Sequence, residues 1–152
     1  MVTALGNAAL DRGDTNQAIA HYTAITRAQP DNATALNNLG RAAARMGDTG
    51  SALRYFEAAE RADPRNTDAL NNLGAVLISM GRAADGLSYI DRALALRPDF
   101  GRAHSNRALG LVALGRWSEA WQAVERARTL GAEPPPPVLA ALREHMPAPA
   151  AP

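Results

Sequence analysis

Apolar residues recur at helical spacing in short segments of the chain, and residues that end helices separate the segments. Between Asn32 and Met46 the apolar positions recur every three or four residues, on one side of a helix: Ala35, Leu36, Leu39, Ala42 and Ala43. Gly47 follows at the place where a left-handed glycine commonly closes a helix. The pattern therefore predicts a helix over 32–46.

A second helix is predicted directly after that glycine. Asp48 or Thr49 supplies an N-cap, and apolar residues continue at Leu53, Phe56 and Ala59. Pro64 ends the helix, because its ring cannot continue the hydrogen-bonding pattern. No segment alternates between apolar and polar residues with the period of two that a strand needs, so we expect no sheet.

This pair of helices is repeated along the chain with a step of 34 residues. The hexapeptide ALNNLG begins at Ala35 and again at Ala69. Four further columns keep the step: Gly6, Gly40, Gly74 and Ala108; Gly13, Gly47, Gly81 and Gly115; Pro30, Pro64 and Pro98; Ala18, Ala52, Gly86 and Ala120. The sequence therefore predicts four units, at about residues 1–30, 31–64, 65–98 and 99–131.

The small residues of these columns indicate where helices approach closely. We expect Gly40 on the first helix of a unit to face Ala52 on the second, and Ala59 and Ala93 to lie between neighbouring units. Larger side chains fill the space beside these contacts: Tyr22, Tyr55, Phe56 and Ile90.

The unit resembles the tetratricopeptide repeat, whose 34-residue helix–turn–helix carries a bulky residue and Leu-Gly, then Ala–bulky–Ala, then proline. The second and third units match this pattern: Leu36, Leu39, Gly40, Ala52, Phe56, Ala59 and Pro64; Leu70, Leu73, Gly74, Gly86, Ile90, Ala93 and Pro98. The outer units depart from it, with Ile25 at a small-residue place and His104, Arg107 and Ala108 in the fourth unit. Terminal units of a stack are commonly atypical. The resemblance implies an all-α fold, a right-handed α-solenoid of four units.

The C-terminal segment has a different composition. Four prolines, Pro134–Pro137, predict a stiff extended spacer over 132–137. A short helix over 138–146, with Val138, Leu139 and Leu142 on one side, is expected to cap the last unit. The alternative is a detachable peptide that docks elsewhere. Residues 147–152 are predicted to be a disordered tail.

Asparagines occupy equivalent places on three consecutive first helices: Asn38, Asn72 and Asn106, which we call the amide ladder. First helices line the concave side of such a stack, and a carboxamide both donates to and accepts from an extended peptide backbone. The ladder resembles the asparagines that bind extended peptides in the repeat superhelix of O-linked N-acetylglucosamine transferases. Two simpler explanations remain: copying during repeat duplication, and hydrogen bonding between neighbouring units.

Residues beside the ladder determine the chemistry of the expected groove. Asn37, Asn71 and Ser105 flank it, and Arg41 and Arg45 lie one and two turns further along the helix. Asp68 and Arg102 lie at the N-terminal ends of their helices, and the groove becomes more apolar toward the later units: Ala75, Ser79, Leu109 and Ala113. A segment with an acidic part near Arg41 and Arg45 and an apolar part near Leu109 fits this gradient. A solvated face is the simpler explanation of the arginines.

Another known use of the fold, a clamp for a chaperone's C-terminal carboxylate, does not fit the sequence. Read from the first unit, Asp68 and Asn72 stand where the clamp needs cations. Read from the second unit, Arg41 stands where the clamp needs Asn, and Asn106 stands where it needs a cation. We therefore expect no such clamp.

Composition excludes several other classes of function. The formal net charge of +1 gives no strong attraction to nucleic acid or anionic membranes. The absence of Cys removes disulfides, thiolate metal ligands and Cys nucleophiles. No apolar run approaches the roughly 20 residues that span a bilayer. We expect no nucleic-acid partner and no membrane insertion.

Nothing in the sequence predicts catalysis, a metal or a cofactor. His21, His104 and His145 lie in different segments without a cluster of other ligands, and neither a nucleophile elbow nor a phosphate loop is present. Trp117 and Trp121 have the spacing of a packing pair on one helix; stacking on a ligand is the alternative.

The sequence thus predicts a non-catalytic protein-interaction scaffold whose groove binds an extended partner segment through Asn37, Asn38, Asn71, Asn72, Asn106, Arg41, Arg45 and Arg102. Two alternatives are self-association through exposed ends of the stack and a recognition domain of a larger enzyme such as a glycosyltransferase. No signal peptide is evident at the N-terminus, so we expect a cytoplasmic protein, or a periplasmic one if the chain has been trimmed. Related repeats often serve bacterial assembly machinery.

Overall fold

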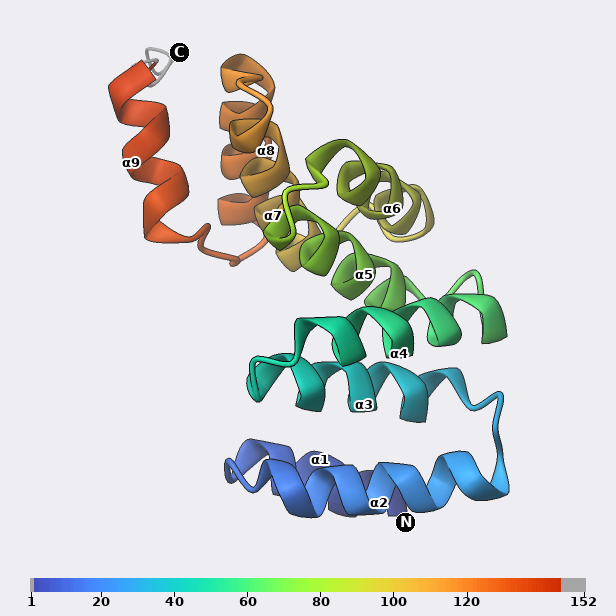
Figure 1. The fold of residues 1–152 in the computed structure, drawn as a ribbon. Coiled ribbons are helices and arrows are strands. Elements are labelled where there is room, and N and C mark those ends of the chain that lie inside the picture. Colours follow the sequence, from blue (N-terminus) through green and yellow to red (C-terminus); the bar gives the residue numbers. More distant parts are fainter. Residues whose placement is uncertain (1, 146–152) are drawn as a thin grey trace.

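The computed structural model describes residues 2–145, and these form nine helices and no strand. The helices are α1 (Val2–Asp11), α2 (Thr15–Ala28), α3 (Ala33–Arg45), α4 (Thr49–Ala62), α5 (Thr67–Ser79), α6 (Ala83–Leu96), α7 (Gly101–Ala113), α8 (Trp117–Thr129) and α9 (Pro136–His145). The first eight form four antiparallel pairs that stack one upon another (Figure 1). The prediction of an all-α solenoid is confirmed. The predicted tail, 147–152, lies outside the described residues.

Side chains and glycines fix the ends of the helices. Asn32 accepts a hydrogen bond of 2.9 Å from the backbone nitrogen of Ala35 and so caps α3, and Asn66 caps α5 in the same way through Ala69 at 3.0 Å. Asp48, rather than Thr49, caps α4 by accepting from the backbone nitrogen of Ser51 at 2.9 Å.

The glycines at the turns within the units have a positive φ, a backbone conformation that residues with a side chain rarely adopt. Gly13, Gly47, Gly81 and Gly115 have φ values of 81°, 79°, 80° and 68°. L-residues rarely adopt this left-handed region. The unbroken glycine column of the sequence therefore follows from the tight turn that connects the two helices of each unit.

Small residues bring the two helices of a unit together. A Cβ atom at Gly74 would lie 2.6 Å from the carbonyl oxygen of Gly86, so the third unit needs glycine on both sides. In the second unit the ring of Phe56 covers Gly40, and a Cβ there would lie 2.5 Å from it. The ring of Phe56 thus occupies the space that a side chain at position 40 would need.

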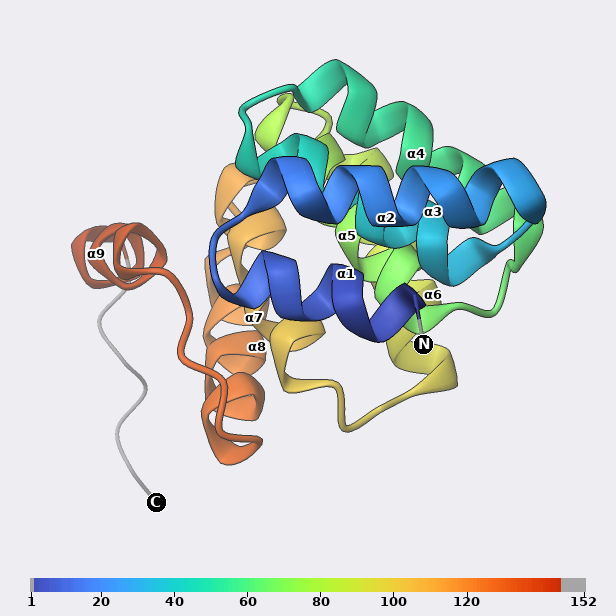
Figure 2. The same ribbon diagram turned by 90° about the horizontal axis from the view of Figure 1, so that it is seen from below.

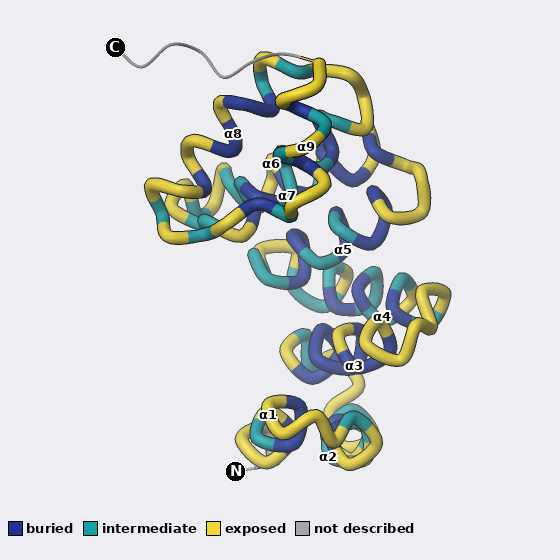
Figure 3. Tube along the Cα trace, turned by 90° about the vertical axis from the view of Figure 1, so that its left-hand side faces the viewer, coloured by how far each residue is buried: buried dark blue, intermediate teal, exposed yellow. Residues whose placement is uncertain are grey.

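Neighbouring units pack through the second helix of one and the first helix of the next: α2 on α3, α4 on α5 and α6 on α7. Ala59 is fully buried between Leu36 of its own unit and Ala69 of the next, as expected. Burial follows this arrangement, with buried positions at the contacts between helices and exposed ones at the turns (Figure 3). The core is a continuous column of small clusters.

The C-terminal helix covers the end of the last unit. Val138 and Leu142 of α9 are 1% and 0% exposed and share a cluster with Leu111 and Val124. α9 lies beside α7 and α8 at the end of the stack (Figures 1 and 2). It begins at Pro136, inside the segment predicted to be spacer, because proline is well tolerated in the first turn of a helix. Across the described residues, none of the helices has the length and apolar character needed to cross a bilayer.

Candidate functional site

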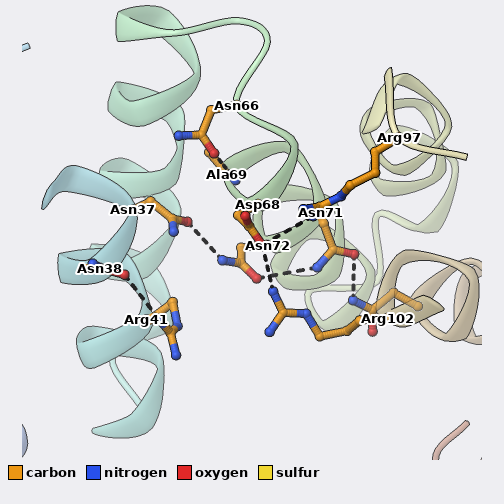
Figure 4. A network of polar contacts seen from close by, with 11 residues as sticks. Asn37, Asn38, Arg41, Asn66, Asp68, Ala69, Asn71, Asn72, Arg97 and Arg102 are labelled. Atoms are coloured by element: carbon orange, nitrogen blue, oxygen red, sulfur yellow. Dashed lines mark hydrogen bonds and ion pairs between the residues drawn. The ribbon is translucent and has the colours of Figure 1, made fainter. Parts of the chain in front are cut away.

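The amide ladder forms hydrogen bonds from one unit to the preceding one. Asn72 on α5 donates through Nδ2 to Oδ1 of Asn37 on α3, at 2.8 Å. Asn106 on α7 repeats the contact with Asn71 on α5, at 2.9 Å. Figure 4 shows the amide groups of Asn37, Asn72 and Asn71 arranged in series across the junction. Hydrogen bonding between neighbouring units, one of the simpler explanations of the ladder, is therefore present.

These bonds use part of each amide's capacity. A carboxamide has two N–H groups and an oxygen that accepts twice. The Asn72 oxygen also receives a long hydrogen bond of 3.5 Å from Asn71, and its side chain is partly exposed. Asn71, in contrast, is fully buried. We therefore assign Asn71 to the bridge between units and not to the surface of the groove.

The junction of the first two units uses different partners. Asn38, 4% exposed, donates to Oδ1 of Asn7 at 3.3 Å, and the same oxygen accepts a shorter bond of 2.6 Å from the Tyr22 hydroxyl. Burial raises the pKa of Tyr22; Arg41 opposes this shift and the Asp11 carboxylate adds to it. Asn7 has the place of Arg41 one unit earlier and also lines the groove, although the predicted site residues did not include it.

A cavity of about 480 Å³ runs along the inner face of the stack. Residues of α1, α3, α5 and α7, with the cap residue Asn66, line this first cavity: Asn7, Leu10, Asp11, Thr34, Asn37, Asn38, Arg41, Asn66, Asp68, Asn72 and Arg102. Five predicted site residues therefore lie together on it. Thr34 and Asn66 also line the cavity but were not predicted from the sequence, because residues of these types are common at the starts of helices.

A second cavity, of about 420 Å³, adjoins the first and has a more apolar floor. Its lining residues come from α3, α4 and α5: Arg41, Ala44, Arg45, Thr49, Phe56, Asn72, Ala75, Val76 and Ser79. Arg41 and Asn72 line both cavities, so the two form one groove. Leu109, the expected apolar end, lines neither cavity and packs against the core, whereas Ala75 and Ser79 lie in the groove as expected.

The three predicted arginines have different partners. Arg41 donates to Oδ1 of Asn38 at 3.1 Å, and Arg45 donates to the backbone oxygen of Leu10 at 3.1 Å. Arg102 forms an ion pair of 3.0 Å with Asp68, which lies at the same place one unit earlier. Asp68 also pairs with Arg97 at 3.5 Å (Figure 4). The Asp68 charge is therefore shared by two cations.

The remaining perturbed groups belong to helix ends. Hydrogen bonding to Ser51 lowers the pKa of Asp48 at the start of α4, and hydrogen bonding to Arg116 lowers the pKa of Glu119 at the start of α8. Over the described part of the chain, no three His, Asp or Glu side chains are grouped as a metal site would need.

The histidines and tryptophans lie outside the groove lining. His104 contacts the backbone oxygen of Pro98 at 2.9 Å. Trp117 stacks on His145 with ring centroids 4.2 Å apart, and Trp121 is buried in the cluster beneath α9. Both tryptophans therefore contact the chain's own C-terminal part.

Comparison with known proteins gives matches to one family. Two family models of the tetratricopeptide repeat match the chain, at residues 3–64 and 43–109. No curated protein matches in sequence.

Solved structures share the fold. A crystal structure of a MamA protein is 21% identical with a TM-score of 0.74, covering 95% of this chain and 80% of that chain. MamA from Desulfovibrio magneticus is 22% identical with a TM-score of 0.73, covering 85% and 73%. At these identities the likeness shows the fold alone.

An O-GlcNAc transferase mutant from Thermobaculum terrenum is 29% identical, with a TM-score of 0.78. The match covers 84% of this chain but 25% of that chain. The chain thus spans about a quarter of the transferase's length.

Proposed function

Because the chain belongs to the tetratricopeptide repeat family, whose stacked units present an extended concave surface, we propose that it is a non-catalytic scaffold for protein interaction. The groove formed by the first and second cavities binds an extended segment of a partner protein. The single observation that carries this proposal is the place of Asn72, whose partly exposed amide lies where the two cavities meet.

The hydrogen-bonding capacity of the groove suits a peptide backbone. Asn72 keeps one N–H group beyond its bridge to Asn37, and Asn37 and Asn38 also line the first cavity. An extended segment offers a backbone N–H and C=O at every residue. The bridges between units hold these amides in fixed positions, so little side-chain entropy is lost when a partner binds.

Hydrogen bonds alone do not give a stable complex. Each contributes about 1 kcal/mol net, whereas micromolar affinity needs about 8 kcal/mol. The remainder has to come from side chains of the partner that fill the cavities. The apolar floor of the second cavity, Phe56 and Val76, supplies a surface on which such burial is favourable.

The proposal is tested by blocking the groove without altering any ladder residue. The probe is a displayed library of random peptides of about twelve residues, long enough when extended to cross several units. We expect the wild-type chain to select peptides, and Thr34→Trp in the first cavity and Ala44→Trp in the second to abolish their binding. Gln122→Trp, at an exposed position on α8, is the matched control. Selected peptides that bind both blocked variants as tightly as the control would contradict the proposal.

A second candidate is the recognition part of a larger enzyme, favoured by the 29% identity to one quarter of the O-GlcNAc transferase. Under this alternative the same groove presents partner segments to a catalytic domain elsewhere in the polypeptide. The mass of the native protein, detected by antibody in its source cells, distinguishes the two. A polypeptide of 16.0 kDa excludes a larger enzyme.

Self-association through the first unit is a third candidate. Leu5 on α1 is 48% exposed, and a cavity of about 230 Å³ opens on α2 beside Ala24, Ile25 and Ala28. Exposed apolar side chains on the outer face of a terminal unit favour contact with another copy. Sedimentation velocity over a wide concentration range tests this, since a constant monomer excludes it.

A further inference from the structure

Two arginines that line the groove, Arg41 and Arg45, form no ion pair with any carboxylate of the described residues. Among the described residues, several arginines form ion pairs with nearby acidic groups: Arg82, Arg92, Arg97, Arg102, Arg107, Arg116 and Arg128. Arg41 and Arg45 form none within this part of the chain. Their hydrogen-bond partners are neutral oxygens, those of the Asn38 side chain and of the Leu10 backbone. Each guanidinium uses one of its five N–H donors in these contacts.

In the second cavity, Arg41 and Arg45 lie beside apolar residues. Arg41 and Arg45 lie one turn apart on α3, and the same cavity is lined by Phe56 and Val76. Ala44 and Ala75 are small, so space remains between the arginines and the floor. A cavity of about 420 Å³ has room for more than one partner side chain.

The acidic residues that line the groove lie in the first cavity and not in the second. No Asp or Glu is among the described residues that line the second cavity. Asp11 and Asp68 line the first cavity, and Asp68 is held by Arg97 and Arg102. The second cavity therefore offers two exposed guanidinium groups beside apolar surface, and a hydrogen bond from a guanidinium to a carboxylate is stronger than one between neutral groups.

We propose that the second cavity is a specificity subsite for a partner segment in which an acidic and a large apolar side chain stand two residues apart. In an extended chain, every second side chain points to the same face. The carboxylate binds Arg41 and Arg45, and the apolar side chain lies on Phe56 and Val76. This inference rests on the proposed binding of an extended segment, and adds which sequence that segment carries.

The test begins with the peptides that the displayed library yields on the wild-type chain. We expect Asp or Glu two positions from Leu, Met or Phe in the enriched sequences. A fluorescent peptide of this kind is then titrated by anisotropy, beside a copy with Gln in place of Glu. The neutral copy should bind the wild-type chain about tenfold more weakly, because a charge-assisted contact is lost. This comparison involves no protein variant and so no question of folding.

Protein variants locate the subsite. The double variant Arg41→Gln, Arg45→Gln should bind the acidic peptide at least about tenfold more weakly and no longer distinguish it from the neutral copy. The double variant Arg61→Gln, Arg126→Gln changes the net charge equally at exposed positions on α4 and α8 and should bind as the wild type does. Ala75→Leu fills the cavity, and should remove the preference for the apolar residue while both arginines remain.

The outcomes separate this inference from the proposed function. Peptides that bind in the groove, are blocked by Thr34→Trp and show no preference for acidic residues would overturn the subsite alone. Equal loss of affinity in the two arginine double variants would also overturn it. Failure of the wild-type chain to select any peptide would overturn both the subsite and the proposed function.

Discussion

The side-chain nitrogen of Asn106 donates to the side-chain oxygen of Asn71, 35 residues earlier, at 2.9 Å. Asn72 makes the equivalent bond to Asn37 at 2.8 Å, with the same separation of 35 residues. The separation exceeds the repeat step by one because each of these two ladder asparagines contacts the asparagine that precedes the ladder position in the preceding unit. The repeated NN dipeptide thus links consecutive units by a polar bridge.

The hydrogen bond between Asn37 and Asn72 is expected to stabilise the fold through a direct interaction of the two side chains. Replacing either residue by Ala should lower the free energy of unfolding by about 1–3 kcal/mol, because the remaining partner loses its hydrogen bond across the junction. In a double-mutant cycle measured by urea denaturation, the coupling energy should be about 1 kcal/mol. Asn37 and Asn106 share no hydrogen bond, so the effects of replacing these two residues on the free energy of unfolding should be additive. A coupling no larger than in this control pair would contradict the bridge.

The fold was predictable because its causes are local and repeated. The glycine column at Gly13, Gly47, Gly81 and Gly115 marked each turn, and the structure gives every one of them a positive φ. The C-terminal boundary was less accurate, since a run of prolines favours both an extended spacer and the first turn of a helix, and α9 begins at Pro136.

The site was predictable only in part. Sequence spacing placed Asn38, Asn72 and Arg41 on the inner face, and they line the groove. Sequence spacing does not show with which group an amide forms a hydrogen bond. The bond from Asn72 to Asn37 and the burial of Asn71 could therefore be found only in the three-dimensional structure. Nor does it show that Phe56, read as a core residue, also forms the floor of a cavity.

Because Gly74 and Gly86 approach closely, the addition of one methyl group at Gly74 is expected to destabilise the protein. Gly74→Ala should lower the free energy of unfolding by about 1–3 kcal/mol, because its Cβ would lie 2.6 Å from a backbone oxygen that cannot easily move. Gly50→Ala is the control: its nearest neighbouring atom is 3.8 Å away, and alanine should stabilise α4 by up to about 1 kcal/mol. Thermal unfolding of both variants checks this, and equal effects would refute the packing explanation.

The burial of Tyr22, which raises the pKa of its phenol, predicts an alkaline transition. The folded pKa of Tyr22 is raised above its unfolded value. Its contribution to stability is therefore complete below the unfolded pKa of about 10 and is lost as the pH rises through the folded pKa. Tyr22→Phe should be less stable than the wild type near neutral pH, and the difference should shrink as the pH rises.

Urea unfolding from about pH 7 to about pH 11 measures this effect. Tyr89→Phe, on α6, serves as the control for the loss of a phenol. A difference between wild type and Tyr22→Phe that stays constant over the whole range would contradict the prediction.

The cap and the detachable-peptide interpretations of α9 predict different effects of one substitution. Leu142 is fully buried against the last unit, so Leu142→Ala should lower the free energy of unfolding by about 2–5 kcal/mol if α9 is a permanent cap. Hydrogen exchange in α7 and α8 should then become faster. Arg143→Ala, next to it and exposed, should have little effect. Unchanged exchange in Leu142→Ala would favour a helix that leaves the stack.

The binding groove itself is tested most directly by NMR of the asparagine side-chain amides. The chain is labelled with heavy nitrogen and titrated with a peptide selected from the displayed library. We expect the Nδ2 resonances of Asn72 and Asn38 to shift on binding, while that of Asn16, exposed on α2, stays in place. Shifts confined to the second helices, with the Asn72 and Asn38 resonances unmoved, would contradict a peptide bound along the inner face.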